Sequence, residues 1–164
     1  MERKGFTTIE LIITLSIIAL VFSFGTFSLH QAQKKLSINA SSSIVMNAVT
    51  TAARRARSGS NESAWGAYFD YDDVSRTGSQ ITLFSGDSYA LRDTTRDIFY
   101  KIGDSVVFQN VSLSGGLPST GDDHQIVFTS LSGETDQYGT ITVESYNEQY
   151  IISISEEGII SKGF

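Results

Sequence analysis

The chain divides into an apolar stretch, a stretch with helical spacing, and a long region in which apolar and polar residues alternate. Residues 11–29 carry no Asp, Glu, Lys or Arg and consist mostly of Leu, Ile, Val, Phe and Ala. At about 1.5 Å per residue, about 20 such residues span the ~30 Å hydrocarbon layer of a membrane. The pattern therefore predicts a membrane-spanning helix. Arg3 and Lys4 before it predict a cytoplasmic N-terminus, with the rest of the chain on the far side.

Apolar residues continue at helical spacing after residue 34. They are Ile38, Val45, Val49, Ala52 and Ala56, at intervals of 7, 4, 3 and 4 positions. This is the period of an amphipathic helix that packs one face on a domain. The run Ser58-Gly59-Ser60-Asn61 favours a helix end, because glycine adopts the left-handed conformation of a helix C-terminus. We therefore predict one rod over residues 6–58, roughly 80 Å long.

Beyond Asn61 the period changes to two, which is typical of strands with one buried and one wet face. The expected strands are 65–69, 80–84, 105–108, 125–129, 140–144, 149–155 and 158–161. Glu156-Glu157-Gly158 predicts a hairpin connection with its glycine at a positive φ. The predicted fold class is α+β: a long N-terminal helix with a membrane-spanning first half, packed on an antiparallel, sandwich-like C-terminal β-domain.

Composition narrows the classes of function. A length of 164 residues suits one domain with an appendage. The net charge of -6 argues against a general nucleic-acid-binding protein, since phosphates are bound by lysine and arginine. The absence of cysteine excludes a disulfide scaffold, a thiolate nucleophile and sulfur-ligated metal sites. With only two histidines we expect no imidazole metal site and no cofactor.

The stretch Gly5-Phe6-Thr7-Thr8-Ile9-Glu10, followed by an apolar run, resembles the class III signal of type IV prepilins and pseudopilins. The resemblance implies that a prepilin peptidase cleaves between Gly5 and Phe6 and that the new N-terminal Phe6 is N-methylated. It also implies that Glu10 sets the axial register of assembly by pairing with the amine of the next subunit. A carboxylate in an apolar phase needs such a partner. The alternative is that Glu10 lies at headgroup level and only favours the helix N-terminus.

Short stretches farther along the chain are similar to the GspH/FimT family of minor pseudopilins and minor type IV pilins. They are Arg55-Ala56-Arg57-Ser58, residues 65–70, 125–128, 140–143 and 154–155, and Gly158-Ile159-Ile160. The chain departs from many pilins in two ways. Its only proline, Pro118, lies outside the apolar helix, where Gly25 is a source of flexibility instead. The absence of cysteine also excludes the disulfide loop of many major pilins, which favours a minor subunit or a pseudopilin.

These resemblances imply a leader peptide (residues 1–5), a transmembrane and assembly helix (6–29), an amphipathic continuation (30–58) and a β-rich globular pilin domain (62–164). The expected function is a structural minor pilin or pseudopilin of a type IV pilus or a type II secretion system; the alternative is a DNA-binding minor pilin of the competence machinery. Expected partners are the prepilin peptidase, other pilin or pseudopilin subunits, the inner-membrane assembly platform and membrane lipid, with DNA disfavoured. The expected location is the inner membrane in single-pass topology, then a filament at the periplasm or cell surface.

Three polar clusters have other candidate chemistry. Asp70-Tyr71-Asp72-Asp73 lacks the spacing of a calcium loop and is interpreted as a solvated acidic turn. Asp122-Asp123-His124, near Ser119 and Thr120, offers no activated nucleophile, so we do not expect an enzyme. Arg54-Arg55-Ala56-Arg57 could contact phosphate or DNA, but the helix dipole also favours basic residues at a helix C-terminus. Trp65 is expected in the core.

Overall fold

The computed structural model describes residues 5–72, 74–75, 77–103, 106–116, 124–145 and 148–163, without the side chains of residues 24–31, 34 and 77. The chain forms two compact units, Met1–Leu36 and Ser37–Phe164, and each is described by itself. Helix α1 (Thr8–Arg57) contributes residues to both units.

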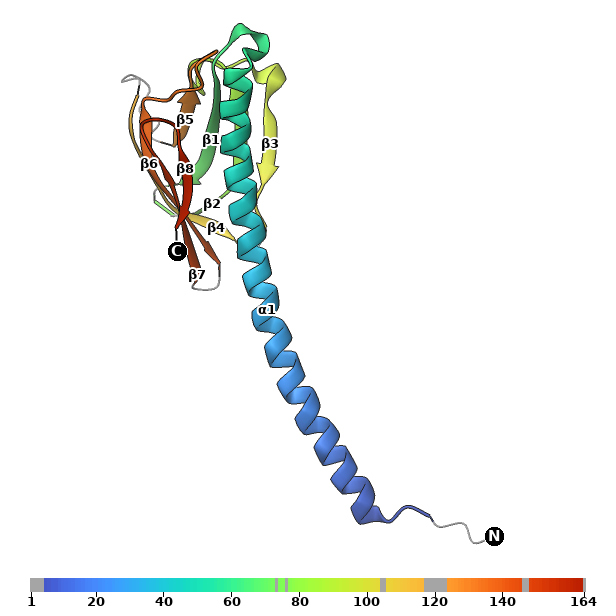
Figure 1. The fold of residues 1–164 in the computed structure, drawn as a ribbon. Coiled ribbons are helices and arrows are strands. Elements are labelled where there is room, and N and C mark those ends of the chain that lie inside the picture. The colour runs from blue at the N-terminus through green and yellow to red at the C-terminus, as the bar shows by residue number, and fades with distance from the viewer. Residues whose placement is uncertain are drawn as a thin grey trace. The chain divides into compact units, whose positions relative to one another are not determined.

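The second unit is built from strands. The elements after α1 are η1 (Ser60–Glu62), β1 (Trp65–Asp72), β2 (Thr77–Ser85), η2 (Thr94–Arg96), β3 (Ile98–Lys101), β4 (Val107–Gly115), β5 (Gln125–Phe128), β6 (Gln137–Ser145), β7 (Glu148–Ile154) and β8 (Ile160–Gly163). The strands pair as two four-stranded antiparallel sheets, in the orders β3-β2-β1-β5 and β4-β6-β7-β8 (Figure 1). Each of the seven strands expected from the sequence overlaps one of these strands.

Strand β3 was not expected from the sequence, and its exposure pattern explains why. Ile98 and Tyr100 pack against the core, whereas Phe99 is 62% exposed on the other face of the sheet. An apolar residue on the wet face removes the alternation by which a short strand is recognised. The pairing of β3 with β2, which aligns Thr82 with Phe99, is therefore a feature of the tertiary structure.

The hydrophobic core of the second unit is shared by α1 and both sheets. The helix contributes Val45, Ala48, Val49, Ala52, Ala53 and Ala56. The stripe predicted from the sequence is confirmed, since Ile38 and its four partners are all fully buried. Four of these six helix residues are alanines, so the helix backbone can approach the sheets closely.

Two contacts of aromatic side chains connect the sheets across this core. Phe69 of β1 and Phe108 of β4 meet edge to face, with ring centroids 5.6 Å apart. The hydroxyl of Tyr71 donates a hydrogen bond of 2.8 Å to the carbonyl oxygen of Gln109, at the irregularity between Phe108 and Asn110. Buried edge-to-face aromatic pairs stabilise a fold by about 0.5–1.5 kcal/mol beyond the effect of burying their apolar area. The core is thus a layered contact of two sheets and one helix.

The first unit corrects the predicted fold class. Within the part of the chain that the structure describes, no helical segment combines the length and the apolarity that a membrane crossing requires. The predicted transmembrane assignment of residues 6–29, and with it the predicted single-pass inner-membrane location, is therefore contradicted.

The predicted rod over residues 6–58 is corrected in its bounds and in its division: α1 spans Thr8–Arg57 and contributes to two separate units. The two units divide between Leu36 and Ser37, so only the later part of α1 belongs to the β-domain. The physical reason lies in the side chains at this boundary. Lys35 and Leu36 are exposed, whereas Ile38 is fully buried and begins the stripe that faces the domain.

Candidate functional site

The predicted cleavage site lies in a short non-helical segment before α1. Gly5, Phe6 and Thr7 are exposed and have no helical structure. Phe6 is 78% exposed, and the space where a Cβ of Gly5 would lie is open. Proteases cleave most readily in exposed segments outside secondary structure. The Gly5–Phe6 bond therefore lies in an exposed segment outside regular secondary structure.

Thr7 caps the helix that follows. Its Oγ1 accepts a hydrogen bond of 3.3 Å from the backbone N–H of Glu10, and its carbonyl oxygen accepts one of 3.2 Å from Leu11. Threonine at the N-cap with glutamate three residues later is the sequence signature of a capping box. The helix consequently begins at Thr8 rather than at Phe6. The sequence analysis did not use this signal, although Thr7 and Glu10 carry it.

Glu10 lies in the first turn of α1, and its side chain is exposed. Among the described residues it forms no ion pair. A carboxylate in the first turn is favoured by the helix dipole, by about 0.3–1 kcal/mol at exposed positions. The capping geometry supports a local role at the helix N-terminus, and the free carboxylate remains available for a partner on another chain.

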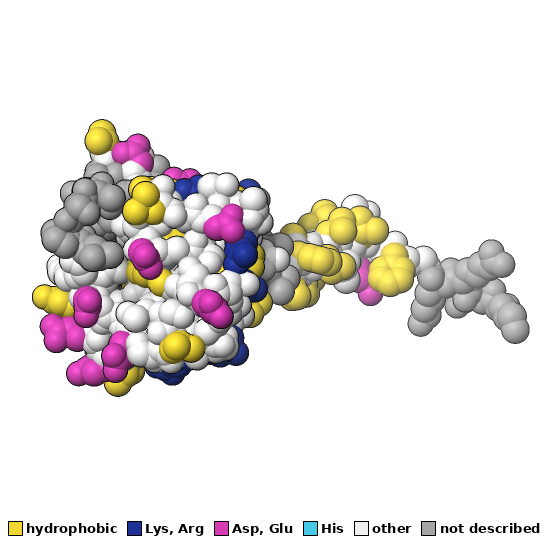
Figure 2. All heavy atoms as spheres, turned by 90° about the horizontal axis from the view of Figure 1, so that it is seen from above, with side chains coloured by type: hydrophobic (Ala, Val, Ile, Leu, Met, Phe, Trp, Pro, Cys, Tyr) yellow, Lys and Arg dark blue, Asp and Glu magenta, His cyan; other side chains and the backbone are white. Residues whose placement is uncertain are grey.

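The next turns of α1 expose a continuous apolar surface. Ten large apolar side chains are at least half exposed: Ile9, Leu11, Ile12, Ile13, Leu15, Ile17, Ile18, Leu20, Val21 and Phe22. They include consecutive residues, so they lie on all sides of the helix. Figure 2 shows hydrophobic side chains gathered along this part of the chain. The hydroxyls of Thr14, Ser16 and Ser23 donate to backbone carbonyls one turn earlier, which satisfies them within the helix.

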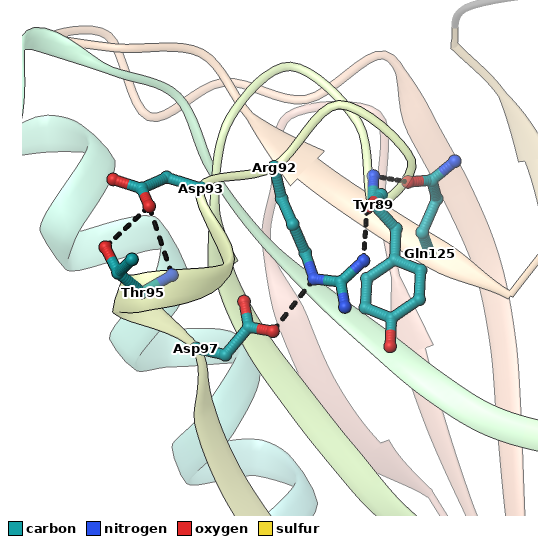
Figure 3. Close-up of polar contacts among 6 residues, drawn as sticks. All are labelled: Tyr89, Arg92, Asp93, Thr95, Asp97 and Gln125. Carbon is teal, nitrogen blue, oxygen red and sulfur yellow. Dashed lines mark hydrogen bonds and ion pairs between the residues drawn. The ribbon is translucent and has the colours of Figure 1, made fainter.

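A second cluster of polar residues lies in the connection between β2 and β3 (Figure 3). Arg92 Nε donates to Asp97 Oδ2 at 2.9 Å, and Arg92 Nη1 donates to the carbonyl oxygen of Tyr89 at 2.7 Å. The guanidinium lies 3.7 Å from the ring centroid of Tyr89, whose ring stacks on Tyr68 at 3.8 Å. The backbone N–H of Tyr89 donates to Gln125 Oε1 at 2.8 Å.

This cluster fastens the β2–β3 connection onto the sheet. Tyr68 belongs to β1 and Gln125 to β5, so the contacts of Tyr89 join the connection to two strands. The Asp97 side chain is 5% exposed, and its Oδ1 has no hydrogen-bond partner among the described groups. The contacts are those of a structural anchor and include no nucleophile next to a base. Its members lie from residue 68 to residue 125 without a characteristic spacing, so the sequence did not reveal it.

Asp93 in this connection is expected to make the fold sensitive to acid. Its Oδ1 accepts hydrogen bonds from Thr95 Oγ1 at 2.6 Å and from Thr95 N at 3.1 Å, which lower the pKa of Asp93, and Arg96 lowers it further. A carboxylate with a lowered folded pKa stabilises the fold above its unfolded pKa of about 3.9, and the contribution is lost as pH falls through the folded value. As the pH falls below about 4, the free energy of unfolding should therefore decrease less in Asp93→Ala than in the wild type.

Denaturant unfolding of the full chain at several pH values checks this expectation. The matched control is Asp87→Ala, which removes another exposed aspartate of the same connection. Equal acid dependence in the Asp93→Ala variant and the wild type would contradict the proposed contribution.

The predicted acidic turn is partly described. Asp72 Oδ1 accepts from Val74 N at 2.9 Å and Oδ2 accepts from Ser75 Oγ at 2.8 Å, and these bonds lower the pKa of Asp72. Asp73 lies outside the described residues. In the portion of the chain that is described, no three His, Asp or Glu residues come together as metal ligands would.

Of the cluster Asp122-Asp123-His124 with Ser119 and Thr120, only His124 is described. Its ring meets Tyr71 edge to face at 5.1 Å, and its carbonyl oxygen accepts from Phe69 N at 2.8 Å. These contacts place His124 beside β1. The described residues therefore give this histidine a packing role, and the remaining members of the cluster stay untested.

The predicted core position of Trp65 is confirmed, since the residue is 1% exposed. Its Nε1 donates to the carbonyl oxygen of Ser60 at 2.9 Å, and the guanidinium of Arg55 lies 4.5 Å from the ring centroid. Gly5 and Phe6 thus lie in an exposed segment before α1, Glu10 lies exposed in the first turn of that helix, and the other described clusters are structural. Comparisons with protein-family models, with curated proteins and with solved structures find no match for this chain, so its functional interpretation rests on the residues themselves.

Proposed function

We propose that this protein is a structural subunit of a pilin-like filament, of the minor pilin or pseudopilin kind. It is made as a precursor, is cleaved between Gly5 and Phe6 by a prepilin peptidase, and assembles through the first part of α1. The observation that carries this proposal is the apolar surface formed by the ten exposed side chains from Ile9 to Phe22.

An apolar surface on all sides of a helix requires several neighbours. A helix that is hydrophobic all round is stable when other apolar groups surround it. Burying one such side chain contributes about 1.5–3 kcal/mol. Copies of this helix, or the similar helices of related subunits, would cover each other's apolar surface at the centre of a filament. Assembly then draws its free energy from the same residues that make the isolated segment insoluble.

The charges near the helix N-terminus would fix the register of that packing. Cleavage after Gly5 gives Phe6 a free ammonium group, four residues before the exposed carboxylate of Glu10. An unpaired charge among apolar helices is costly, so neighbouring subunits are stable only at the axial offset that pairs an ammonium with a carboxylate. The exposed carboxylate, which has no ion pair among the described residues, supports this role.

Processing tests the proposal directly. The chain is produced with its native peptidase, and intact-mass spectrometry measures the mature protein. We expect the wild type to lose residues 1–5 and to carry one methyl group on Phe6. Gly5→Leu should keep residues 1–5, because the proposed peptidase requires a small residue there, while the open space around Gly5 means that the new side chain meets nothing in the chain itself.

The matched control is Ala19→Leu, which adds the same kind of bulk within the exposed apolar helix but far from the cleavage site. This variant should be processed like the wild type. Normal removal of residues 1–5 from Gly5→Leu, or an uncleaved wild-type chain in its native host, would refute the proposal.

A further inference from the structure

The end of α1 in the second unit carries arginines that the helix does not need. Arg54 and Arg57 are exposed. Two carbonyl oxygens of this last turn already have backbone donors: Ser58 N bonds to Arg54 O at 3.0 Å, and both Gly59 N and Leu131 N bond to Ala56 O, at 3.0 and 2.8 Å. The backbone therefore caps the helix without the guanidinium groups. Neither arginine forms an ion pair among the described residues.

Arg57 is held in place although it is exposed. Its side chain packs on the buried Gly133, where a Cβ would overlap it. Gly133 has a φ of 66°, which is inexpensive for glycine. Arg55, in contrast, has its guanidinium over Trp65. A guanidinium on a fixed stem loses little side-chain entropy when it binds a carboxylate, and arginine is frequent among the residues that dominate interface energies.

Leu131 donates its backbone N–H to the carbonyl oxygen of Ala56, which precedes Arg57 in the chain, and it is unusual in two respects. It is 75% exposed, and it has a φ of 70°, in the left-handed region that favours glycine or asparagine. Among the described residues, positive φ at a non-glycine position occurs at Asn61, Glu62 and Leu131. All three lie beside the C-terminal end of α1. Strained backbone tends to be retained at sites that bind partners.

We propose that Leu131 and Arg57 form a contact surface for a second copy of this chain, with carboxylates of that copy opposite Arg57. The charge distribution identifies the occupant. Residues 37–164 contain 16 of the 18 Asp and Glu residues and only eight of the 12 Lys and Arg residues. Figure 2 shows Asp and Glu side chains spread over the surface of this domain. An arginine with a fixed stem and no carboxylate partner among the described residues, near an exposed leucine, is complementary to such a surface.

This contact goes beyond the proposed packing of the first part of α1, because it lies entirely in the second unit. One patch of each domain would bind a different patch of the next domain. Such a heterologous contact extends a chain of subunits and does not close a dimer. It would add a contact between domains to the contact between helices.

Site-specific photo-crosslinking in the full-length chain tests the proposal. A photoreactive amino acid replaces Leu131 in cells that also produce the same chain with a second epitope tag. The matched control carries the photoreactive residue at Leu91, which is 78% exposed in the β2–β3 connection. We expect an adduct that contains both tags from position 131, at least tenfold more abundant than from position 91. Equal yields from the two positions, or an adduct of position 131 with a different protein only, would overturn the proposal.

Charge variants examine the role of Arg57. Arg57→Glu should lower the yield of the two-tag adduct from position 131 at least tenfold. The control is Arg96→Glu, which changes another exposed arginine, one that pairs with Asp93 at 2.9 Å. An unchanged yield in Arg57→Glu would refute the contact with carboxylates.

Leu131→Gly separates binding from folding. Glycine relieves the positive φ, so the thermal midpoint should stay equal or rise. Assembly that depends on Leu131 should nevertheless decrease, measured as crosslinking between copies through a photoreactive residue at position 132. An unaltered yield there would contradict the proposal. Failure of this contact leaves cleavage at Gly5 unaffected, so the intact-mass experiment tells it apart from failure of the proposed function.

Discussion

Replacing Glu10 with alanine is expected to leave cleavage at Gly5 intact and to remove the protein from filaments. The cleavage site and the Thr7 cap, which bonds to the backbone of residue 10, are unchanged by the substitution. In the assembled state the ammonium of Phe6 would lose its carboxylate partner. Removing one member of a buried ion pair costs about 3–5 kcal/mol, and each 1.4 kcal/mol corresponds to about a tenfold change in an equilibrium constant. We therefore expect the incorporated fraction to fall by about 100-fold or more.

The experiment compares processed subunit in cells with subunit in sheared filaments. Glu10→Gln keeps the shape but removes the charge, and it should be nearly as defective as Glu10→Ala. The matched control is Thr14→Ala, one turn away, which removes a hydroxyl that donates to Glu10 O at 2.9 Å. Wild-type incorporation of Glu10→Ala would remove the register role. It would leave the capping box as the explanation for a glutamate at this position.

Replacing Phe108 with alanine is expected to cause a large loss of stability in the second unit. Phe108 is fully buried and meets Phe69 of the other sheet edge to face. The substitution removes this contact and leaves a cavity between the sheets, at a cost of about 3–5 kcal/mol. For a unit of this size the thermal midpoint should fall by about 10–20 °C.

Thermal and denaturant unfolding, followed by near-ultraviolet circular dichroism, measure this loss. The control is Phe99→Ala, which truncates a phenylalanine that is 62% exposed on β3. Its effect should stay within about 0.5–1 kcal/mol, because little apolar area leaves water in the folded state. Similar losses in both variants would show that Phe108 does not hold the sheets together.

The spacing of apolar residues over a few positions was enough to predict much of the secondary structure of the second unit. The spacing of Ile38, Val45, Val49, Ala52 and Ala56 predicted the buried face of α1, and all five are fully buried. A helix face is set by residues three and four positions apart, so no distant contact is needed to recognise it. The alternation in β6 and β7 predicted strands for the same reason. Gly158 has the predicted positive φ, of 73°, because turn geometry is also local.

The residues of the candidate site are also close together in the sequence. Gly5, Phe6 and Glu10 were selected by their order along the chain, and all three are exposed, the first two before α1 and Glu10 in its first turn. What the sequence did not give correctly is the environment of the helix that follows. An apolar run of sufficient length predicted a membrane span, whereas no helical segment among the described residues has the length and apolarity of one. Hydropathy records how apolar a segment is and leaves open what covers it.

Contacts between residues far apart in the sequence were decided by the tertiary structure alone. Leu131 bonds to Ala56 at the end of α1, Tyr89 joins Tyr68 and Gln125, and Phe108 meets Phe69. None of these pairs has a fixed spacing, because the length of the connection between two strands does not determine which side chains meet.

The sequence by itself therefore determined the helix faces, most strands and the segment proposed for cleavage, since each depends on neighbours within a few residues. Only the tertiary structure decided the order of strands in the two sheets, the presence of β3, and the division of α1 between Leu36 and Ser37. It alone placed Leu131 against Ala56 and Gly133 against Arg57. These features depend on which surfaces exclude water together, and that is a property of the whole folded chain.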